Sequence, residues 1–491
     1  ASGTGGLGLA IDISGQSVTY ATGGDGGSGT TASAGVAAAS NLGNGGGGAS
    51  FNTTGGRVGG AGGSGLVVVR YLGAAAGTGG TLAAGTGRAL GYTVQTFTSN
   101  GTLALGALEA TFSGNITGTG SLTANPASGG KFTFTGTNSY AGSTTLSAGT
   151  LQVGTGGLAG SLGALNAAVI NNGTLIFNRS DALSYSGLFS GTGALTVATG
   201  GLTLTGGATY TGLTTLSSTA TASSVTYTNS AVPSTSGFAG KGAVTIQPAA
   251  NGTFSSAVNT NRYSLASTLT ALTLGSSTNT VAMTIGASIN IAGPISIYGG
   301  TINLNADITS TAANAAMLFK SAGDIAQAAN VDVLTNGGST VYWANSDGGN
   351  SAGMVLLDTG ATITTQGGHV WLGGSATANG QTTWHGLTVG DGYAASGTSV
   401  SFAGGSPWKG GIVLKRSQIS SGGGDVSLYG YGATGGSGFV NFDNTTINAG
   451  TGQILINAKS SGIVAFLPGL HSSVLPLAVF ELRSANTGTD A

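Results

Sequence analysis

The stretch that decides the fold is Phe132-Thr-Phe-Thr-Gly-Thr-Asn-Ser-Tyr-Ala-Gly-Ser-Thr-Thr-Leu146, because it returns 70 positions later as Leu202-Thr-Leu-Thr-Gly-Gly-Ala-Thr-Tyr-Thr-Gly-Leu-Thr-Thr-Leu216. Eight of the fifteen positions are identical, and both copies run through an alternating apolar stretch, a Tyr-x-Gly and a Thr-Thr-Leu. A repeat made of strands and glycine turns, without a helix-forming stretch, is typical of a stacked β architecture. We therefore predict an all-β solenoid.

The composition agrees with strands and tight turns. Only 5% of the 491 residues are charged, 96 are glycine, and 40% are hydrophobic. Glycine disfavours helices and threonine favours strands. A glycine- and serine-rich chain can also be disordered, but from about residue 91 onward apolar residues alternate in runs bounded by Gly and Asn, which indicates a packed core.

Charge and cysteine content exclude several classes of function. The net charge is -1 and no basic cluster is present, so nucleic acid is not an expected partner. The chain has no cysteine, which excludes disulfides and thiolate metal sites and fits a protein that crosses an oxidising periplasm unfolded.

Four regions follow one another along the chain. Residues 1–73 are a glycine-rich segment and residues 74–110 are connecting strands, followed by two solenoid regions at 111–260 and 261–491. The glycine-rich segment is either a flexible linker or a set of packed polyproline-II-like strands, in which only glycine permits close approach, and we favour the packed form.

Residues 113–217 resemble the passenger-associated transport repeat of autotransporters. The resemblance rests on Gly118-Thr-Gly120 and Gly191-Thr-Gly193, on the alternating strand with its Tyr-x-Gly corner, and on strands such as Gly149-Thr-Leu-Gln-Val-Gly154. In that family the repeat is a segment of right-handed parallel β-helix. The resemblance therefore implies that fold here, together with an outer-membrane translocator as partner during export.

A second rhythm begins near residue 270, where apolar residues recur at intervals of seven and then two. The sets are Ile295, Ile302 and Leu304; Leu334, Val341 and Trp343; Ile363, Val370 and Leu372; Tyr393, Val400 and Phe402; Ile419, Val426 and Leu428; and Ile447, Ile454 and Ile456. We expect successive coils in which these residues point inward. The sequence pattern of residues 270–466 resembles that of the large filamentous-haemagglutinin-type bacterial exoproteins. This resemblance implies a role in adhesion or biofilm formation.

The ionisable residues predict no catalytic, cofactor or metal site. The three histidines, His369, His385 and His471, are far apart in the sequence and show no ligand spacing, so we expect them to be scattered on the surface. Clustered acids, which a β-helical carbohydrate-active enzyme needs, are missing. Lys415 and Asp443 each follow an inward strand residue in adjacent 28-residue coils, so we predict a stacked, exposed ion pair.

Tryptophans mark a possible contact surface. All four, Trp343, Trp371, Trp384 and Trp408, lie within 66 residues. The alternation places Tyr342 and Trp371 at the same outward position in neighbouring coils, where two exposed rings could bind sugars or another protomer. Trp384 and Trp408 join them as candidate contacts. The alternative is that a loop, residues 373–384, packs over these rings.

Three functions follow from these observations. The first is a segment of a large secreted or surface-displayed bacterial exoprotein, acting as a rod-like adhesin or matrix fibre that binds a glycan or another cell-surface ligand. The second is a filament or sheath subunit that associates with itself through open solenoid ends. The third is a β-helical carbohydrate-active enzyme, which the missing acids disfavour. The first two place the chain outside the cell or on its surface.

Overall fold

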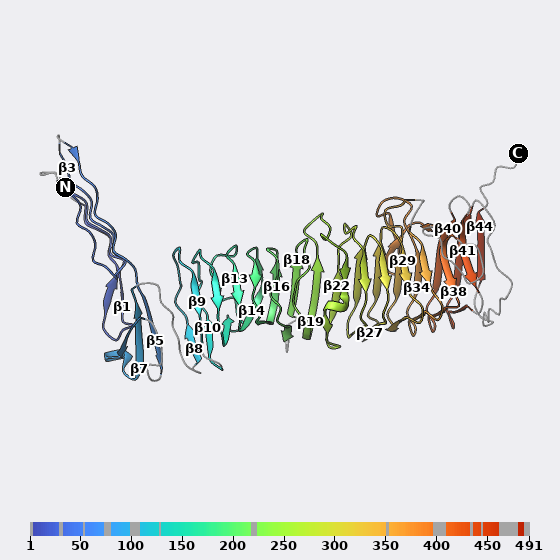
Figure 1. Ribbon diagram of the computed structural model, residues 1–491, viewed down its shortest axis with the longest axis horizontal. Coiled ribbons are helices and arrows are strands. Elements are labelled where there is room, and N and C mark those ends of the chain that lie inside the picture. The colour runs from blue at the N-terminus through green and yellow to red at the C-terminus, as the bar shows by residue number, and fades with distance from the viewer. Residues whose placement is uncertain are drawn as a thin grey trace.

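The computed structural model is an elongated molecule built from strands (Figure 1). It describes residues 3–28, 33–52, 55–72, 80–98, 109–126, 129–217, 223–349, 353–395, 409–432, 436–442, 445–460 and 480–485. The helical elements in these ranges are two short 3-10 turns, η1 (Gly87–Ala89) and η2 (Thr260–Arg262). None of the helical segments described is long and apolar enough to cross a membrane.

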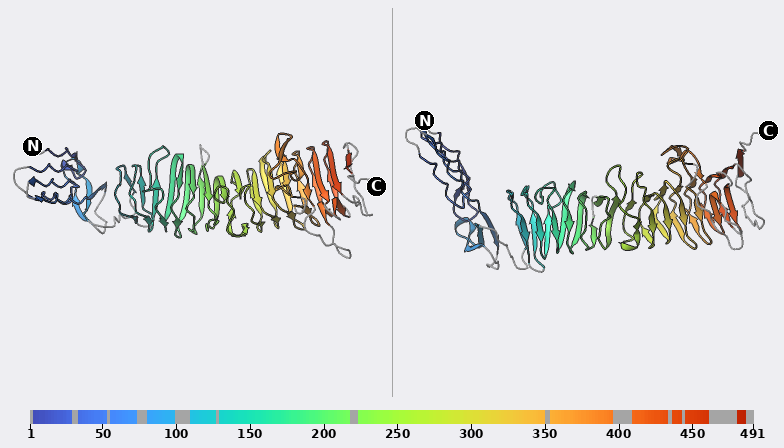
Figure 2. Two further views of the ribbon diagram at one scale, coloured as in Figure 1. Left: turned by 90° about the horizontal axis from the view of Figure 1, so that it is seen from above. Right: turned by 45° about the horizontal axis from the view of Figure 1, so that its top comes forward.

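The glycine-rich segment packs as extended chains lying side by side, seen in dark blue in Figure 2. Its short strands are β1 (Leu9–Ile11), β2 (Val18–Tyr20), β3 (Phe51–Asn52) and β4 (Gly55–Gly56). Hydrogen bonds between the chains recur every third residue: Gly45 N and Gly48 N donate to Thr22 O and Asp25 O, both at 2.7 Å. A period of three is that of polyproline II, whose backbone makes no hydrogen bonds of its own. Neighbouring extended chains therefore provide the hydrogen-bond partners for one another's backbone groups.

A small antiparallel sheet follows the glycine-rich segment. It consists of β5 (Val67–Leu72), β7 (Tyr92–Phe97) and β6 (Thr81–Ala84) in that order. Val69 and Tyr71 are buried while Val67 is half exposed, as expected for a strand with one face toward a core.

From Glu109 onward the chain winds in coils whose strands pair in parallel with those of the next coil. The longest sheet contains β8 (Glu109–Phe112), β10 (Lys131–Phe134), β12 (Thr150–Val153), β14 (Thr174–Tyr185), β16 (Ala194–Leu204), β17 (Thr214–Ser217), β18 (Ser223–Thr228), β19 (Gly237–Gln247), β21 (Ser264–Leu265), β22 (Ala271–Leu274), β25 (Ile295–Gly299), β28 (Met317–Ser321), β31 (Thr340–Trp343), β34 (Val370–Gly373), β37 (Ala394–Ala395), β40 (Val426–Gly432), β43 (Ile454–Ser460) and β44 (Phe480–Ala485).

Three further parallel sheets form the other faces of the coils. The first holds β9 (Leu122–Ala124), β11 (Thr144–Leu146), β13 (Val169–Asn171) and β15 (Phe189–Ser190). The second holds β20 (Val258–Asn259), β23 (Met283–Ile285), β26 (Ile302–Leu304), β29 (Ile325–Gln327), β32 (Val355–Leu357), β38 (Gly410–Lys415) and β41 (Ser437–Phe442). The third holds β24 (Ile289–Ile291), β27 (Ile308–Ala313), β30 (Asp332–Asn336), β33 (Thr362–Thr364), β39 (Gln418–Ser420) and β42 (Thr446–Asn448).

The inward side chains form one continuous core along the stack. In the coil that starts at Ile295, the pairs Ile295 and Ile297, then Ile302 and Leu304, are fully buried. Each such side chain contributes about 1.5–3 kcal/mol of burial free energy. The prediction of an all-β chain with stacked parallel coils is confirmed, and the fold is consistent with a β-helix.

The two copies of the fifteen-residue repeat lie on different faces of the coils. One column of paired residues runs through successive coils of the longest sheet: Phe132, Leu151, Leu175 and Leu195. The last of these lies in the first part of β16. Leu202, the sequence counterpart of Phe132, lies further along the same strand, where it pairs with Leu183 and Val225. The second strand of the later copy, β17, pairs with β16 at Leu195. β17 therefore lies in the same column as β10, which is the first strand of the earlier copy.

What the copies share is their local structure. Tyr140 and Tyr210 are both buried, and each phenol oxygen lies 2.6 Å from the hydroxyl of the threonine four residues on, Thr144 or Thr214. Burial raises the pKa of Tyr210 to about 12, although hydrogen bonds to Thr214 and to neighbouring hydroxyls oppose this. The Tyr-x-Gly corner is thus a buried, hydrogen-bonded bend, and the repeat encodes strand, corner and strand instead of one whole coil.

The predicted inward residues are correct in most later coils and wrong in two. Leu334 and Tyr393 were both predicted to point inward, but they are half-buried and lie outside the main core, to which Val333 belongs instead of Leu334. Val370, Leu372, Val426 and Leu428 are buried inside the coils as predicted. In the coil of β31, however, the inward residue is Tyr342, whereas Val341 and Trp343 lie outside the main core in a second cluster. A shift of one residue exchanges the two faces of a strand. Val400 and Phe402 lie outside the described residues.

Candidate functional site

Tyr342 and Trp371 lie on opposite faces of the longest sheet. Tyr342 pairs in register with Leu372, and Trp371 pairs with Val341. Tyr342 is fully buried inside the coils, where its ring packs against Phe319 with ring centroids 4.9 Å apart. The prediction that Tyr342 and Trp371 share an outward position was therefore wrong.

A buried polar network explains why a tyrosine faces inward. The Tyr342 hydroxyl donates to Oε1 of Gln327 at 2.7 Å. The Gln327 side-chain amide donates in turn to the carbonyl oxygens of Val331 at 2.7 Å and Thr362 at 2.9 Å. Burial raises the pKa of Tyr342 well above its usual value, so the phenol stays a neutral donor. Its role is structural.

A hairpin covers Trp371 on the outer face. Val341, Trp343, Trp371 and Val389 form a buried cluster outside the main core. Val389 belongs to the antiparallel hairpin of β35 (Gln381–Trp384) and β36 (Leu387–Gly390). The sequence left open whether a loop would pack over the aromatic residues. For Trp371 the covering segment is this hairpin, whereas Trp408 lies outside the described residues.

The cluster also holds a buried cation. The Lys320 ammonium lies 3.8 Å from the centre of the Trp343 ring, and Lys320 is only 8% exposed. Burial lowers the pKa of Lys320 because it disfavours the charged form. The face of a tryptophan ring stabilises a cation held over it by about 0.5–2 kcal/mol. Trp343 is therefore fully occupied by contacts inside the cluster, including a hydrogen bond from its indole nitrogen to Ser375 Oγ at 2.8 Å.

Two of the three histidines meet beside the hairpin. His369, just before β34, and His385, at the hairpin tip, stack with ring centroids 4.1 Å apart and planes 12° apart. Nε2 of His385 lies 2.9 Å from Oδ2 of Asp425. The prediction of scattered histidines was wrong for this pair, and His471 lies outside the described residues. We name His369, His385 and Asp425 the histidine latch.

Hydrogen bonding fixes the protonation of His369. Its Nδ1 accepts the backbone N–H of Asp425 at 2.9 Å, so the neutral ring carries its proton on Nε2. One possible ligand atom from each of His369, His385 and Asp425 lies within 4.8 Å of the others, but in this tautomer neither nitrogen of His369 offers a free lone pair to an ion. Burial and the nearby His385 lower the pKa of His369, while Asp425 opposes them.

The hairpin tip holds His385 in an unusual backbone conformation. His385 has φ +46° and Gly386 has φ +76°, the signs that a tight hairpin turn of type I′ requires. Asparagine before glycine is the preferred sequence for this turn, and a histidine there is uncommon. Trp384, the residue before it, packs edge-on against both imidazoles at centroid distances of 5.4 and 4.7 Å.

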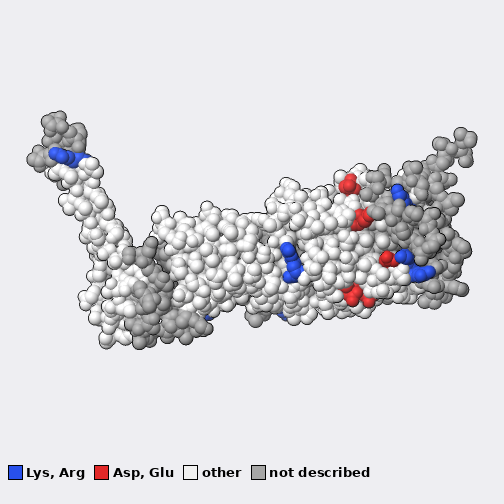
Figure 3. All heavy atoms as spheres, viewed as in Figure 1, with Lys and Arg blue, Asp and Glu red and all other residues white. Residues whose placement is uncertain are grey.

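Lys415 forms an ion pair, with Asp358. Its Nζ lies 2.8 Å from Oδ1 of Asp358, in the coil before its own. Asp443 lies outside the described residues, so the predicted pair of Lys415 with Asp443 stays a prediction. Partial burial works against the ionised form of Asp358, yet the hydrogen bond from Lys415 and the backbone N–H of Thr359 together hold its pKa below the usual value. On the face seen in Figure 3, charged side chains gather over these later coils.

An Asp358→Asn variant should destabilise the fold by less than about 1 kcal/mol, because the ion pair is partly exposed. Since the pKa of Asp358 is lowered in the folded protein, its contribution is present above the unfolded pKa of about 3.9 and is lost as the pH falls through the folded value. Urea unfolding of both proteins at pH 7 and pH 3 measures this. A difference that persists unchanged at pH 3 would contradict the electrostatic account.

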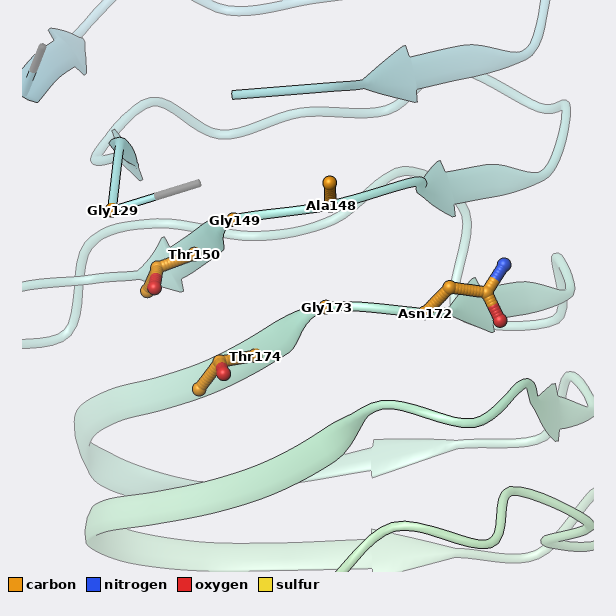
Figure 4. A pocket seen from close by; sticks show the side chains of 7 residues that line it. All are labelled: Gly129, Ala148, Gly149, Thr150, Asn172, Gly173 and Thr174. Atoms are coloured by element: carbon orange, nitrogen blue, oxygen red, sulfur yellow. The ribbon is translucent and has the colours of Figure 1, made fainter. Parts of the chain in front are cut away.

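A shallow notch of about 450 Å³ lies over the transport-repeat region (Figure 4). Its lining residues are Gly129, Ala148, Gly149, Thr150, Asn172, Gly173 and Thr174. Stacked Gly-Thr pairs leave room there because glycine has no side chain. Among the described residues, those that line the notch carry no ionisable side chain.

Comparison with known proteins supports the resemblance of the repeat region. Residues 127–153 match the family model described as Passenger-associated-transport-repeat. The adhesin BmaC autotransporter of Brucella suis biovar 1 (strain 1330) is 42% identical to this chain over 97 residues, which is 19% of this chain and 3% of that protein. No solved structure matches the chain. The transport-repeat resemblance is thus confirmed over residues 127–153, whereas the filamentous-haemagglutinin-type resemblance stays a prediction.

Proposed function

We propose that this chain is a segment of a bacterial surface adhesin, carried through the outer membrane by a translocator and displayed outside the cell. The observation that carries the proposal is the passenger-associated transport repeat at residues 127–153, which lies within the stacked parallel coils. The similarity to an adhesin autotransporter supports adhesion as the activity and a role other than catalysis. The right-handed winding known for this repeat and the exoprotein character of residues 270–466 belong to the same proposal.

The mechanism of such an adhesin is geometric. Parallel coils add about 4.8 Å of length for each turn, so a long stack holds contact surfaces away from the membrane. Weak contacts repeated on many displayed copies then give strong attachment through avidity. Among the described candidate residues, Trp384 at the hairpin tip is the least buried tryptophan, whereas Trp343 and Trp371 are covered. We assign Trp384 as the first candidate for contact with a glycan or protein ligand.

Beads coated with the folded chain should attach to host cells and immobilised glycans more than beads coated with the same chain after heat denaturation. A Trp384→Ala variant should reduce attachment several-fold, and Leu158→Ala, which changes an exposed apolar residue in the transport-repeat region, serves as a matched control. Equal attachment of folded and denatured chains would contradict the adhesive function. Release of sugar fragments from the glycan would instead favour an enzyme.

The self-assembling filament remains a second candidate because of the end of the longest sheet. Within the described residues, the outer edge of β8 pairs with no further strand, since its pairing is with β10. An exposed strand edge is a template for another chain. Electron microscopy of the purified chain distinguishes the two functions: long polymers favour the filament, and dispersed particles that attach to cells favour the adhesin.

A further inference from the structure

We propose that hairpin β35–β36 is a strap that releases the aromatic surface beneath it when the surroundings become acidic, with the histidine latch as the proton sensor. The proposal concerns a conformational change and does not rest on the adhesive function. It draws on three independent features: a buried cluster outside the main core, a histidine pair that joins the strap to the coils, and a strained turn that positions one of these histidines.

The strap is built as an addition to the coil. β34 pairs directly with β40, so the sheet of the stack is continuous past the hairpin. The strands of the hairpin pair with each other in an antiparallel sheet of their own, separate from the stacked sheets. Side chains hold its strands on the coils: Val389 is fully buried, and Leu387 and Trp384 pack against Trp371 and its neighbours. Its base is anchored by backbone hydrogen bonds: Gly374 and Gly392 exchange two, at 3.0 and 3.3 Å, and Asn379 N donates to Ser346 O at 2.7 Å. The strap can therefore lift without breaking the stack.

The latch connects the strap to two successive coils. His385 comes from the strap, His369 from the segment before β34, and Asp425 from the segment before β40. Oδ1 of Asp425 also accepts the backbone N–H of Gln453 from the next coil at 2.7 Å, which fixes the carboxylate. The coil side of the latch is therefore rigid, and His385 is the member that moves.

A proton on His369 disrupts this arrangement in two ways. The proton must add to Nδ1, which accepts the backbone N–H of Asp425 in the neutral ring. Once protonated, Nδ1 can no longer accept this hydrogen bond, and two N–H groups face each other. The proton also places a positive charge 4.1 Å from the His385 ring, where a second charge repels it. The first effect joins two coil segments and is the same in the docked and free forms, whereas the repulsion between the two rings exists only when the strap is docked, so docking weakens once both rings are charged.

The direction of the pH effect follows from the lowered pKa of His369 in the docked form. Docking is strongest above the pKa of a free histidine, about 6.5, and weakens as the pH falls below it. The weakening is complete once the pH has passed the lowered value. Between high and low pH, the ratio of open to docked strap rises tenfold for each pH unit by which docking lowers the pKa of His369.

Besides the two histidines, three charged side chains lie in or near the histidine latch or the strap: Asp425, Lys320 and Asp391. The carboxylate that faces the histidines is Asp425, and it attracts a protonated His385 and thereby opposes release. Lys320 lies against Trp343 at the far side of the cluster, and Asp391 at the base of the strap accepts the backbone N–H of Ala376 at 2.8 Å. The two histidines therefore have opposite effects, which variants can separate.

Hydrogen exchange of the intact chain between pH 7.5 and 5.0 tests the proposal. After correction for the intrinsic pH dependence of amide exchange, the amides of residues 381–390 should open several-fold more often at pH 5.0, while those of β33 and β39 stay protected. A His369→Phe variant keeps an aromatic ring against Trp384 but cannot take a proton. It should lose the acid-induced opening.

A second variant keeps the proposal falsifiable if His369→Phe does not fold. His385→Asn retains the preferred residue for the turn and removes the charge on the strap. Its strap should open more often than the wild type at pH 7.5 and show a smaller acid-induced opening, because the repulsion between two charged rings is gone. Wild-type exchange that is the same at both pH values, or acid-induced opening of wild-type size in either variant, would overturn the proposal.

Discussion

A Gly193→Val variant is expected to lose about 3–5 kcal/mol of stability, among the largest effects that a single substitution produces. A Cβ atom on Gly193 would lie 2.1 Å from the carbonyl oxygen and 2.6 Å from the nitrogen of Gly173 in the neighbouring coil. Both are backbone atoms held in the parallel stack, so neither can move aside without breaking hydrogen bonds between coils. Gly193 closes Gly191-Thr-Gly193, so this copy of the motif has a steric reason, whereas Gly120 in the earlier copy has open space at the position of its Cβ.

Gly157→Ala is the matched control for this prediction. Gly157 lies in the same region of the chain, has no left-handed φ, and has open space around the position of its Cβ. Its variant should be as stable as the wild type or up to about 1 kcal/mol more stable, because alanine restricts the unfolded chain. Urea unfolding followed by circular dichroism compares the three proteins. Equal stability of the Gly193→Val and Gly157→Ala variants would refute the close-approach argument.

Gln327→Leu is expected to destabilise the later coils by about 2–4 kcal/mol, since it leaves several buried polar groups without their partner. Gln327 is fully buried and accepts the hydroxyl of Tyr342, while its amide donates to two carbonyl oxygens. Leucine fills a similar volume, so the loss reports the hydrogen bonds and not a cavity. Hydrogen exchange of the amides of β29 and β31 measures the local free energy of opening.

The double variant Gln327→Leu with Tyr342→Phe separates the two parts of this loss. Removing the orphaned hydroxyl should restore about 1 kcal/mol, because replacing both partners of a buried hydrogen bond costs less than removing one. The rest of the loss belongs to the carbonyl oxygens of Val331 and Thr362. If the two substitutions simply add, the buried network does not act as a unit.

The sequence correctly predicts the inward residues of strands in which apolar residues two positions apart face the core. Val370, Leu372, Val426 and Leu428 follow the rule that residues two apart share a face, and all four are buried inside the coils. The rule failed at β31 because both faces of that strand are buried. Val341 and Trp343 are as apolar as core residues, but they are covered by the strap, so alternation alone could not tell the two faces apart.

The histidine latch lay beyond prediction for a different reason. Its three members come from segments that are far apart in the sequence, and their meeting depends on where the strap docks. One signal was available: His385-Gly386 lies between two short alternating stretches, and a residue followed by glycine in that setting indicates a two-residue hairpin turn. Recognising the hairpin would have paired Thr383 with Thr388, but it would not have located Asp425.

The placement of the two repeat copies on different faces means that the length of this protein and the direction in which it points are linked. Because a copy does not correspond to a whole number of coils, gaining or losing one during evolution would rotate every later coil by one face relative to the glycine-rich segment. The strap and its tryptophan, Trp384, would then point to another side. Duplication of this repeat is thus a means of re-aiming a binding surface without altering any residue in it.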